Sequence, residues 1–269
     1  MSPHATTRSM VHLSTTPTET DIPGRPPEVR RQVLSLDSTT GYVTWLLDFP
    51  PRYQSPWAEG RERKLEFHAS AEEILTLEGS LAFGQTYELP SMTYAFHPAG
   101  WVHPAAQHSA EGCRVLMRRS SADIDFEFVE PPRDWDGEEY NALGESGSAG
   151  VTRLAANDLP WLPLLTPAGV DTGISAKVLA KDAGHGWCAW MMSVPAGWRG
   201  AGSEISVSGG DELFLLAGDL TMNEFELREG AFYRDTAEFT YGGPLETSRA
   251  GCLAVRWSLG HPVANLLGQ

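Results

Sequence analysis

The sequence has no run of 18 consecutive apolar residues, and its N-terminus carries no apolar stretch of the kind found in secretory signals. It is also poor in positive charge, with 20 Lys and Arg against 35 Asp and Glu and a formal net charge of −15. A surface of this sign repels nucleic-acid phosphates and anionic lipids. We therefore expect a cytoplasmic protein without nucleic-acid or membrane partners, acting on a small molecule.

Cysteine is scarce as well. The three cysteines, Cys113, Cys188 and Cys252, are widely spaced and form no CxxC pair. Neither a disulfide framework nor a thiolate zinc cluster is indicated, and a reducing compartment fits best. The sequence also lacks a GxSxG elbow, a Walker loop and a GxGxxG after a strand. Serine hydrolase and nucleotide-binding functions therefore have no support.

Short runs of β-branched, aromatic and aliphatic residues, broken by Gly and Pro, are abundant from residue 31 to about 120. Such spacing indicates an all-β sandwich or barrel. The second half repeats the pattern, because EEILTLEGSL (72–81) aligns with DELFLLAGDL (211–220) and EGCRVLM (111–117) with AGCLAVR (250–256). Both alignments have an offset of 139 residues. Two equivalent β domains are therefore predicted.

The predicted organisation has five parts. Residues 1–28, rich in Thr, Ser and Pro, are expected to form a mobile tail or a strap across a neighbouring subunit. One barrel is expected at 29–120 and a second at 171–262, with an acidic, turn-rich connection at 121–170 and a short tail at 263–269. Few short helices are expected.

One stretch of the first repeat, EFHASAEEILTLEG (66–79), begins with polar residues that a buried strand does not need. Glu66, His68 and Glu72 are separated by even steps, so on one continuous strand their side chains share a face. Glu73 is the adjacent alternative to Glu72, since a β-bulge would exchange their faces. One strand face is thus predicted to carry several metal ligands.

A second stretch, HPAGWVHP (97–104), places His103 after a Pro-Ala-Gly turn. Together the two stretches resemble the two cupin motifs, HxHx3Ex6G and PxGxxH. In this chain they read Glu66-x-His68-x3-Glu72-x6-Gly79 and Pro98-x-Gly100-xx-His103. The spacing agrees throughout, and the departure is Glu66, where the family usually has histidine.

The chain looks closest to bicupins related to the anti-sigma-factor type of cupin. This resemblance implies two tandem jelly-roll β-barrels, a homodimer, and one divalent metal held by His68, Glu72 and His103. Two imidazoles and one carboxylate favour non-haem Fe(II) and oxygen chemistry, with Zn, Mn or Ni as alternatives. Glu66 has three interpretations: a fourth metal ligand, a catalytic base, or the mark of a weakened site.

A substrate pocket is predicted around the metal from the apolar residues near the second motif. An apolar pocket of this kind would suit a small aromatic or polyketide-like substrate. The alternative is that these side chains are plain core. The predicted pocket residues are Tyr94, Phe96, Trp101, Met117 and His97.

The second repeat lacks most of these ligands. At the 139-residue offset, Ile205, Val207, Asp211 and Gly242 take the positions of Glu66, His68, Glu72 and His103. Only Asp211 could bind a metal. The second barrel is therefore predicted to be degenerate, with a structural or dimerising role.

The leading functional hypothesis is a metal-dependent bicupin enzyme, an Fe(II) oxygenase or dioxygenase acting on a small enolisable, phenolic or polyketide-like substrate. One alternative is a redox-silent Zn or Mn isomerase, cyclase, hydrolase or decarboxylase. The other is a non-enzymatic cupin that senses a ligand or a metal. No helix-turn-helix segment accompanies that last alternative.

Overall fold

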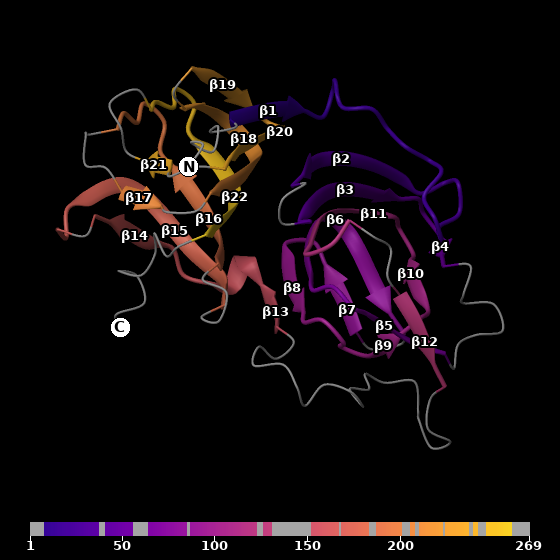
Figure 1. The fold of residues 1–269 in the computed structure, drawn as a ribbon. Helices are drawn as coiled ribbons and strands as arrows, with labels where there is room; N and C mark the ends of the chain where they lie inside the picture. The colour runs from indigo at the N-terminus through magenta and orange to yellow at the C-terminus, as the bar shows by residue number, and fades with distance from the viewer. Residues whose placement is uncertain are drawn as a thin grey trace, which may run out of the picture. The chain divides into compact units, whose positions relative to one another are not determined.

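The computed structural model of the chain describes residues 8–37, 41–55, 64–84, 87–122, 126–130, 152–166, 168–182, 187–200, 205–207, 210–222, 224–236, 239–241 and 246–259. These residues form two compact units (Figure 1). We call residues 16–158 the first barrel, and residues up to 15 together with those from 159 onward the second barrel. Apart from one 3-10 turn, every regular element in the described ranges is a β-strand, so the predicted all-β class is confirmed.

The first barrel consists of a large curled sheet and a small one. The large sheet has the order β13-β8-β6-β11-β3-β2, with β7 and β10 added to β6, and β4 added to β10. The small sheet has the order β12-β5-β9. The elements are β2 (Arg30–Leu36), β3 (Val43–Phe49), β4 (Tyr53–Gln54), β5 (Leu65–His68), β6 (Glu72–Phe83), β7 (Tyr87–Pro90), β8 (Thr93–His97), β9 (His103–Pro104), β10 (Gln107–Ser109), β11 (Cys113–Arg119), β12 (Phe126–Val129), β13 (Thr152–Ala155) and η2 (Ala156–Asp158).

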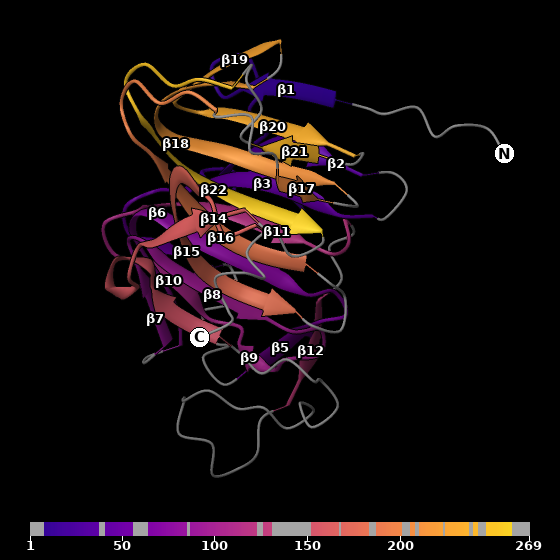
Figure 2. The ribbon, with the colours of Figure 1, turned by 90° about the vertical axis from the view of Figure 1, so that its left-hand side faces the viewer.

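The second barrel repeats this plan. Its large sheet has the order β1-β20-β18-β22-β16-β15-β14, with β19 added to β18, and its small sheet pairs β17 with β21. The long strands of the large sheet lie side by side in Figure 2. The elements are β1 (Arg8–His12), β14 (Leu162–Leu165), β15 (Asp171–Asp182), β16 (Trp187–Val194), β17 (Ile205–Val207), β18 (Asp211–Met222), β19 (Phe225–Arg228), β20 (Ala231–Asp235), β21 (Phe239–Tyr241) and β22 (Cys252–Leu259).

The sequence repeat coincides with a structural repeat. Strand β6 begins at Glu72 and β18 at Asp211, while β11 begins at Cys113 and β22 at Cys252, so the 139-residue offset holds for both pairs. The central strand order β8-β6-β11-β3-β2 corresponds to β20-β18-β22-β16-β15. Each barrel also has its own apolar core, which these strands enclose.

The N-terminal segment differs from the predicted mobile tail. Residues 8–12 form β1, which pairs with β20 in the second barrel, and His12 lies opposite Ala231 in that pairing. Ile22 and Val29 are buried in the core of the first barrel. The polar composition hid these anchors, because a few apolar side chains are enough to fix a short segment against a preformed core.

The region predicted as a connection, 121–170, also contains strands. β12 pairs with β5, and β13 extends the large sheet of the first barrel beside β8. β14, within the Pro-containing stretch WLPLLTPAG, pairs with β15 at the edge of the second large sheet. Proline is tolerated there because an edge strand does not need every N–H for pairing. In the described ranges no helix is both long and apolar enough to cross a membrane.

Candidate metal centre

The candidate metal centre lies between the two sheets of the first barrel. β5 in the small sheet carries Glu66 and His68, and their two-residue separation directs both side chains to the same face. β9 pairs with β5 so that His103 lies directly opposite Glu66. The register of this short antiparallel pair therefore brings the two sequence motifs together.

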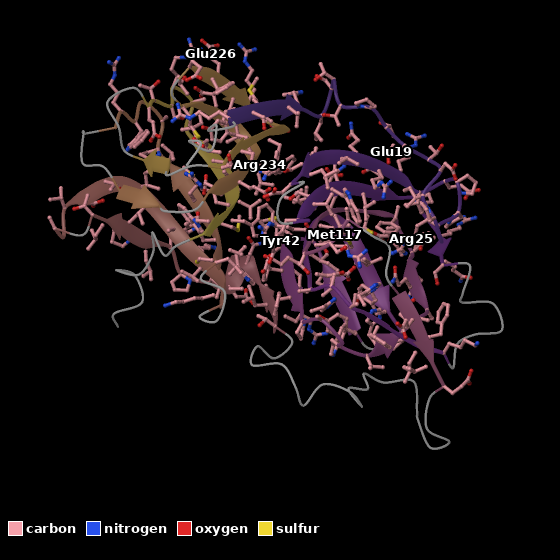
Figure 3. All side chains as sticks on the ribbon, in the orientation of Figure 1. Glu19, Arg25, Tyr42, Met117, Glu226 and Arg234 are labelled. Carbon is pink, nitrogen blue, oxygen red and sulfur yellow. The ribbon has the colours of Figure 1, made fainter. Side chains whose placement is uncertain are left out.

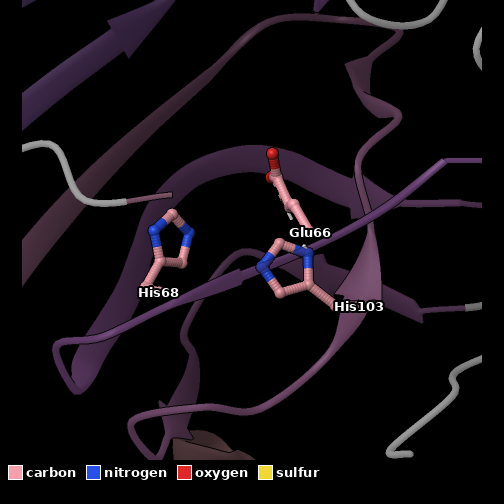
Figure 4. A group of neighbouring side chains, drawn as sticks. All are labelled: Glu66, His68 and His103. Carbon is pink, nitrogen blue, oxygen red and sulfur yellow. Dashed lines mark ion pairs between the residues drawn. The ribbon is translucent and has the colours of Figure 1, made fainter. Parts of the chain in front are cut away.

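Glu66, His68 and His103 converge on one point. Each offers one ligand atom, and the three atoms lie within 4.8 Å of one another. Figure 4 shows the carboxylate and the two imidazoles grouped around a shared space. Glu66 and His103 are 3% and 1% exposed. A largely buried cluster of two imidazoles and one carboxylate has the composition of a site for a divalent metal.

The protonation of His103 suits a metal ligand. Its Nδ1 lies 3.0 Å from the carbonyl oxygen of Pro104. Because a carbonyl can only accept, Nδ1 carries the proton and the lone pair is on Nε2. That Nε2 is buried and has no hydrogen-bond partner among the described residues. Burial lowers the pKa of His103 to about 3, with help from the nearby His68 and His97, so the ring is neutral.

Glu72 lies beside this cluster but has other partners. Its Oε1 is 3.2 Å from Nε of Arg119 and 3.7 Å from Nε2 of His68, and its Oε2 is 3.8 Å from Nδ1 of His97. Burial alone would raise the pKa of Glu72, but His68, His97 and Arg119 outweigh it and lower that pKa well below its usual range. Glu72 is thus a buried carboxylate already paired with a guanidinium.

Glu72 and its neighbour Glu73 point to opposite faces of the sheet, as adjacent residues on a strand do. Glu72 lines the interior cavity, whereas Glu73 accepts hydrogen bonds from Tyr94 (2.7 Å) and Arg118 (3.0 Å) on the other face of the sheet. β6 pairs with β11 without irregularity in this part, so the alternation of faces is not interrupted. Glu72 is therefore the carboxylate of this pair that faces the candidate centre.

Glu66 is held by an amide rather than by a cation. Gln107 donates from Nε2 to Glu66 Oε1 over 3.1 Å. Burial raises the pKa of Glu66 to about 7; the charge of Arg25 opposes this shift, and that of Glu72 adds to it. A carboxylate with a perturbed pKa beside two histidines is typical of a functional site.

The predicted pocket residues take different positions. Met117 lines the cavity at the centre. Trp101 stacks on His103 at a centroid distance of 4.9 Å, and the Nε2 of His97 is 2.8 Å from the hydroxyl of Tyr87. Tyr94 and Phe96 alternate with Ala95 and His97 along β8, so they lie on the opposite face of that strand. A substrate contact from Tyr94, Phe96, Trp101 or His97 stays a prediction.

A cavity of about 40 Å³ adjoins the cluster, lined by Glu66, His68 and Glu72 among others. Its lining also includes polar residues that were not identified from the sequence, among them Arg25, Gln107 and Arg119. Arg119 could have been found, because it follows the interior-facing Met117 by two residues on one strand. Gln107 and Arg25 reach the site through tertiary packing that no local pattern signals.

The second barrel has an ion pair at the equivalent place. Arg256 donates to both oxygens of Asp211, and Ser258 donates to Asp211 Oδ1 over 2.7 Å. At the 139-residue offset, Asp211 corresponds to Glu72 and Arg256 to Met117. A guanidinium thus occupies the interior of this barrel. The side chains of Ile205 and Val207, and all of Gly242, lie outside the part of the chain that the structure describes.

No protein-family model matches the sequence, and no curated protein matches it either. Solved structures do match the fold. A candidate dioxygenase from Nostoc punctiforme is 17% identical, with a TM-score of 0.70 over 93% of this chain and 82% of that one. A candidate glyoxylate-induced protein from Pseudomonas aeruginosa is 14% identical, with a TM-score of 0.61 over 93% and 88%.

A variant of the Bacillus subtilis oxalate decarboxylase also matches, at 9% identity and a TM-score of 0.57 over 93% of this chain and 77% of that one. Identities this low show the fold alone. The fold they show is the cupin jelly roll in two copies, and the predicted architecture of two tandem cupin barrels is confirmed.

Proposed function

We propose that the chain is a metal-dependent bicupin enzyme in which Glu66, His68 and His103 hold one divalent metal. The observation that carries this proposal is the buried Nε2 of His103, which has a free lone pair within a cluster of two further ligand atoms. Buried polar atoms are almost always satisfied. An unsatisfied one aimed at such a cluster supports a ligand at that point.

Glu66 is the proposed carboxylate ligand, in place of the Glu72 that the motif spacing favours. Glu72 is neutralised by Arg119, whereas the nearest polar partner of Glu66 is the uncharged amide of Gln107. Glu66, the residue that departs from the usual cupin motif, would therefore be a metal ligand. We also propose that the chain is related to the anti-sigma-factor type of bicupin, a resemblance that its two motifs support.

The donor set favours Fe(II), because two histidines and one carboxylate with open positions are the ligands of non-haem iron oxygenases. Iron at this site would supply redox chemistry with O2, and we propose an oxygenase acting on a small enolisable substrate. The chain's own residues orient the site. The Pro104 carbonyl fixes the ring of His103, and Gln107 fixes the carboxylate of Glu66.

Metal analysis of protein purified without added metal tests this proposal. We expect about one equivalent of metal, with iron predominant, and loss of most of it in His68→Ala and His103→Ala. Oxygen consumption with candidate substrates, measured in a single turnover, tests the oxygenase step. Full activity under anaerobic conditions would contradict that step, and wild-type metal content in His103→Ala would contradict the site itself.

A further inference from the structure

Arg25 is a charged residue at the cavity that the proposed ligand set does not explain. It belongs to the segment before β2 (Figure 3). Its side chain lines the cavity together with Glu66 and His68. We propose that Arg25 binds the carboxylate of a small oxo acid, the substrate on which the metal centre acts. The reaction in this inference rests on the proposed function, whereas the binding of the carboxylate rests on Arg25.

A tight turn holds Arg25 in place. Its N–H donates to the carbonyl of Ile22 over 3.0 Å, and Gly24, between Pro23 and Arg25, has a φ of 73°. Pro followed by Gly with positive φ is the pattern of a type II turn. Ile22 and Val29, on either side of the turn, are 6% and 0% exposed. The segment is therefore a fixed part of the first barrel, and it presents Arg25 to the cavity.

The hydrogen-bond partners of the Arg25 guanidinium are neutral, and the carboxylates of Glu66 and Glu72 act on its charge only from beyond ion-pair distance. Its Nη1 donates to the hydroxyl of Tyr53 over 2.9 Å and to Oε1 of Gln107, and its centre lies 5.7 Å from the ring of Phe49. Arginine has five N–H donors, so Nε and Nη2 keep three of them. Within the described ranges these two nitrogens have no hydrogen-bond partner, and Arg25 has no ion pair. One edge of the guanidinium is thus available for a bidentate carboxylate.

The other two arginines at the cavity differ in this respect. Arg31 is 2.7 Å from Glu19, and Arg119 is 3.2 Å from Glu72. Both also line the cavity, so they provide an internal comparison. Among the three, Arg25 is the cation whose charge is not neutralised by a described carboxylate at pairing distance.

The charges around the cavity also favour an anion. A divalent metal with Arg25 and Arg119 would bring four positive charges, against two negative charges from Glu66 and Glu72. Excess charge in a buried site is costly unless a counter-charge accompanies it. An enolisable oxo acid could supply both missing charges, one from its carboxylate and one from its enolate.

The size of the cavity narrows the substrate class. Its volume of about 40 Å³ corresponds to roughly three water molecules. Apart from the imidazole of His68, its lining has one aromatic side chain, Trp45. Small oxo acids fit these dimensions better than the phenolic or polyketide-like substrates that the sequence also allowed.

Pyruvate and its neutral isostere pyruvamide would test the inference by isothermal titration calorimetry. Each is titrated into the wild type, Arg25→Gln and the matched control Arg31→Gln, in metal-free and in zinc-loaded form, since zinc does not support turnover with O2. We expect the wild type to bind pyruvate at least about tenfold more tightly than pyruvamide, a difference of about 1.4 kcal/mol. Arg25→Gln should lose this preference and Arg31→Gln should keep it, with equal metal contents.

A wild type without the preference, or an Arg25→Gln variant that retains it, would overturn the inference. Equal losses of the preference for pyruvate in Arg25→Gln and Arg31→Gln would also overturn it, because the anion would then respond to the total positive charge of the cavity rather than to Arg25. Arg25→Lys, which keeps the charge but not the planar fork, should bind pyruvate several-fold more weakly than the wild type. This variant also provides the test should Arg25→Gln fail to fold, and undiminished binding by it would overturn the bidentate contact.

The two proposals fail separately. A wild type that binds no metal would contradict the proposed function, but a charge preference in the metal-free protein that depends on Arg25 would still support the carboxylate site. Conversely, a protein with normal metal content and no charge preference in either form would overturn only the role of Arg25.

Discussion

Glu66 lies opposite His103 across the antiparallel pair of β5 and β9, with Glu66 Oε1 3.9 Å from His103 Nδ1. By contrast, Glu72 lies opposite His97 and Arg119 in its two pairings. The small sheet therefore supplies two histidines and a carboxylate, while the carboxylate on the large sheet is adjacent to a cation. Because their partners differ, we expect Glu66 to matter for metal binding and Glu72 to matter for stability.

Glu66→Gln should lose metal while keeping its fold. An amide is a weaker ligand than a carboxylate, and the loss of a direct ligand should exceed the ~10–100-fold that outer contacts to metal ligands are worth. The change also removes a buried negative charge that only Gln107 and the more distant Arg25 support, so the metal-free stability should change little. Metal titration against a competing chelator, with urea unfolding of the metal-free protein, measures both quantities.

Glu72→Gln is the matched variant, and it should behave in the opposite way. Neutralising Glu72 leaves Arg119 buried without its counter-charge, which should lower the free energy of unfolding by about 3–5 kcal/mol. Metal affinity should stay within a few-fold of wild type. Greater metal loss in Glu72→Gln than in Glu66→Gln would restore Glu72 as the carboxylate ligand.

The ion pair of the second barrel should be replaceable by apolar residues. Arg256→Met alone, which introduces the residue found at the equivalent Met117, leaves Asp211 buried and unpaired and should cost about 3–5 kcal/mol. The double variant with Asp211→Leu removes both charges and should recover most of that loss. Urea denaturation of the two variants measures this, and equal stabilities of the single and double variants would show that the pair is not the cause.

The three thiols should be unreactive in the folded protein. Cys113, Cys188 and Cys252 are all buried, and burial raises the pKa of Cys113 to about 11 and that of Cys252 to about 12. Since the thiolate is the nucleophile, a chromogenic disulfide reagent at pH ~8 should titrate almost no thiol in the native state. The same reagent in denaturant should titrate all three. Prompt reaction of native protein would contradict the burial.

The sequence was sufficient to predict the two barrels and the position of the site. The even spacing of Glu66 and His68 and the turn before His103 predicted that these side chains gather at one place, and they do so from the paired strands β5 and β9, because strand parity is a local property. The partner of Glu72 was not predictable in the same way. Its pairing with Arg119 depends on the register of β6 against β11, which joins residues far apart in the chain.

Arg25 shows the same limit in the segment predicted as a tail. The Pro-Gly pair in DIPGRPPE does signal a turn, but composition gave no indication that Ile22 and Val29 would enter a core. Those two side chains find their partners only after the barrel has formed. Sequence patterns therefore predicted the elements of the site, whereas its electrostatics depended on tertiary contacts.

The motif glycine Gly79 offers a test of the repeat itself. Its φ is 68°, and a Cβ at this position would lie 1.9 Å from the carbonyl oxygen of Gly112. Gly218, its equivalent at the 139-residue offset, has a φ of 82° and would place a Cβ 1.9 Å from the carbonyl oxygen of Gly251. Gly79→Ala and Gly218→Ala should therefore each destabilise the protein by about 4 kcal/mol or more, since backbone must move.

Gly100, also in a cupin motif, is the matched control. It has a φ of 78°, but a Cβ there would meet nothing within 4 Å. Gly100→Ala should therefore cost only the left-handed strain of about 1–2 kcal/mol. Thermal and urea unfolding of the three variants separate strain from steric overlap. Equal losses of stability in Gly79→Ala and Gly100→Ala would mean that backbone conformation alone requires these glycines. The expected larger loss at Gly79 and Gly218 would show that both barrels depend on the same close contact. In each barrel this contact joins the long strand, β6 or β18, to the turn just before its partner strand, β11 or β22.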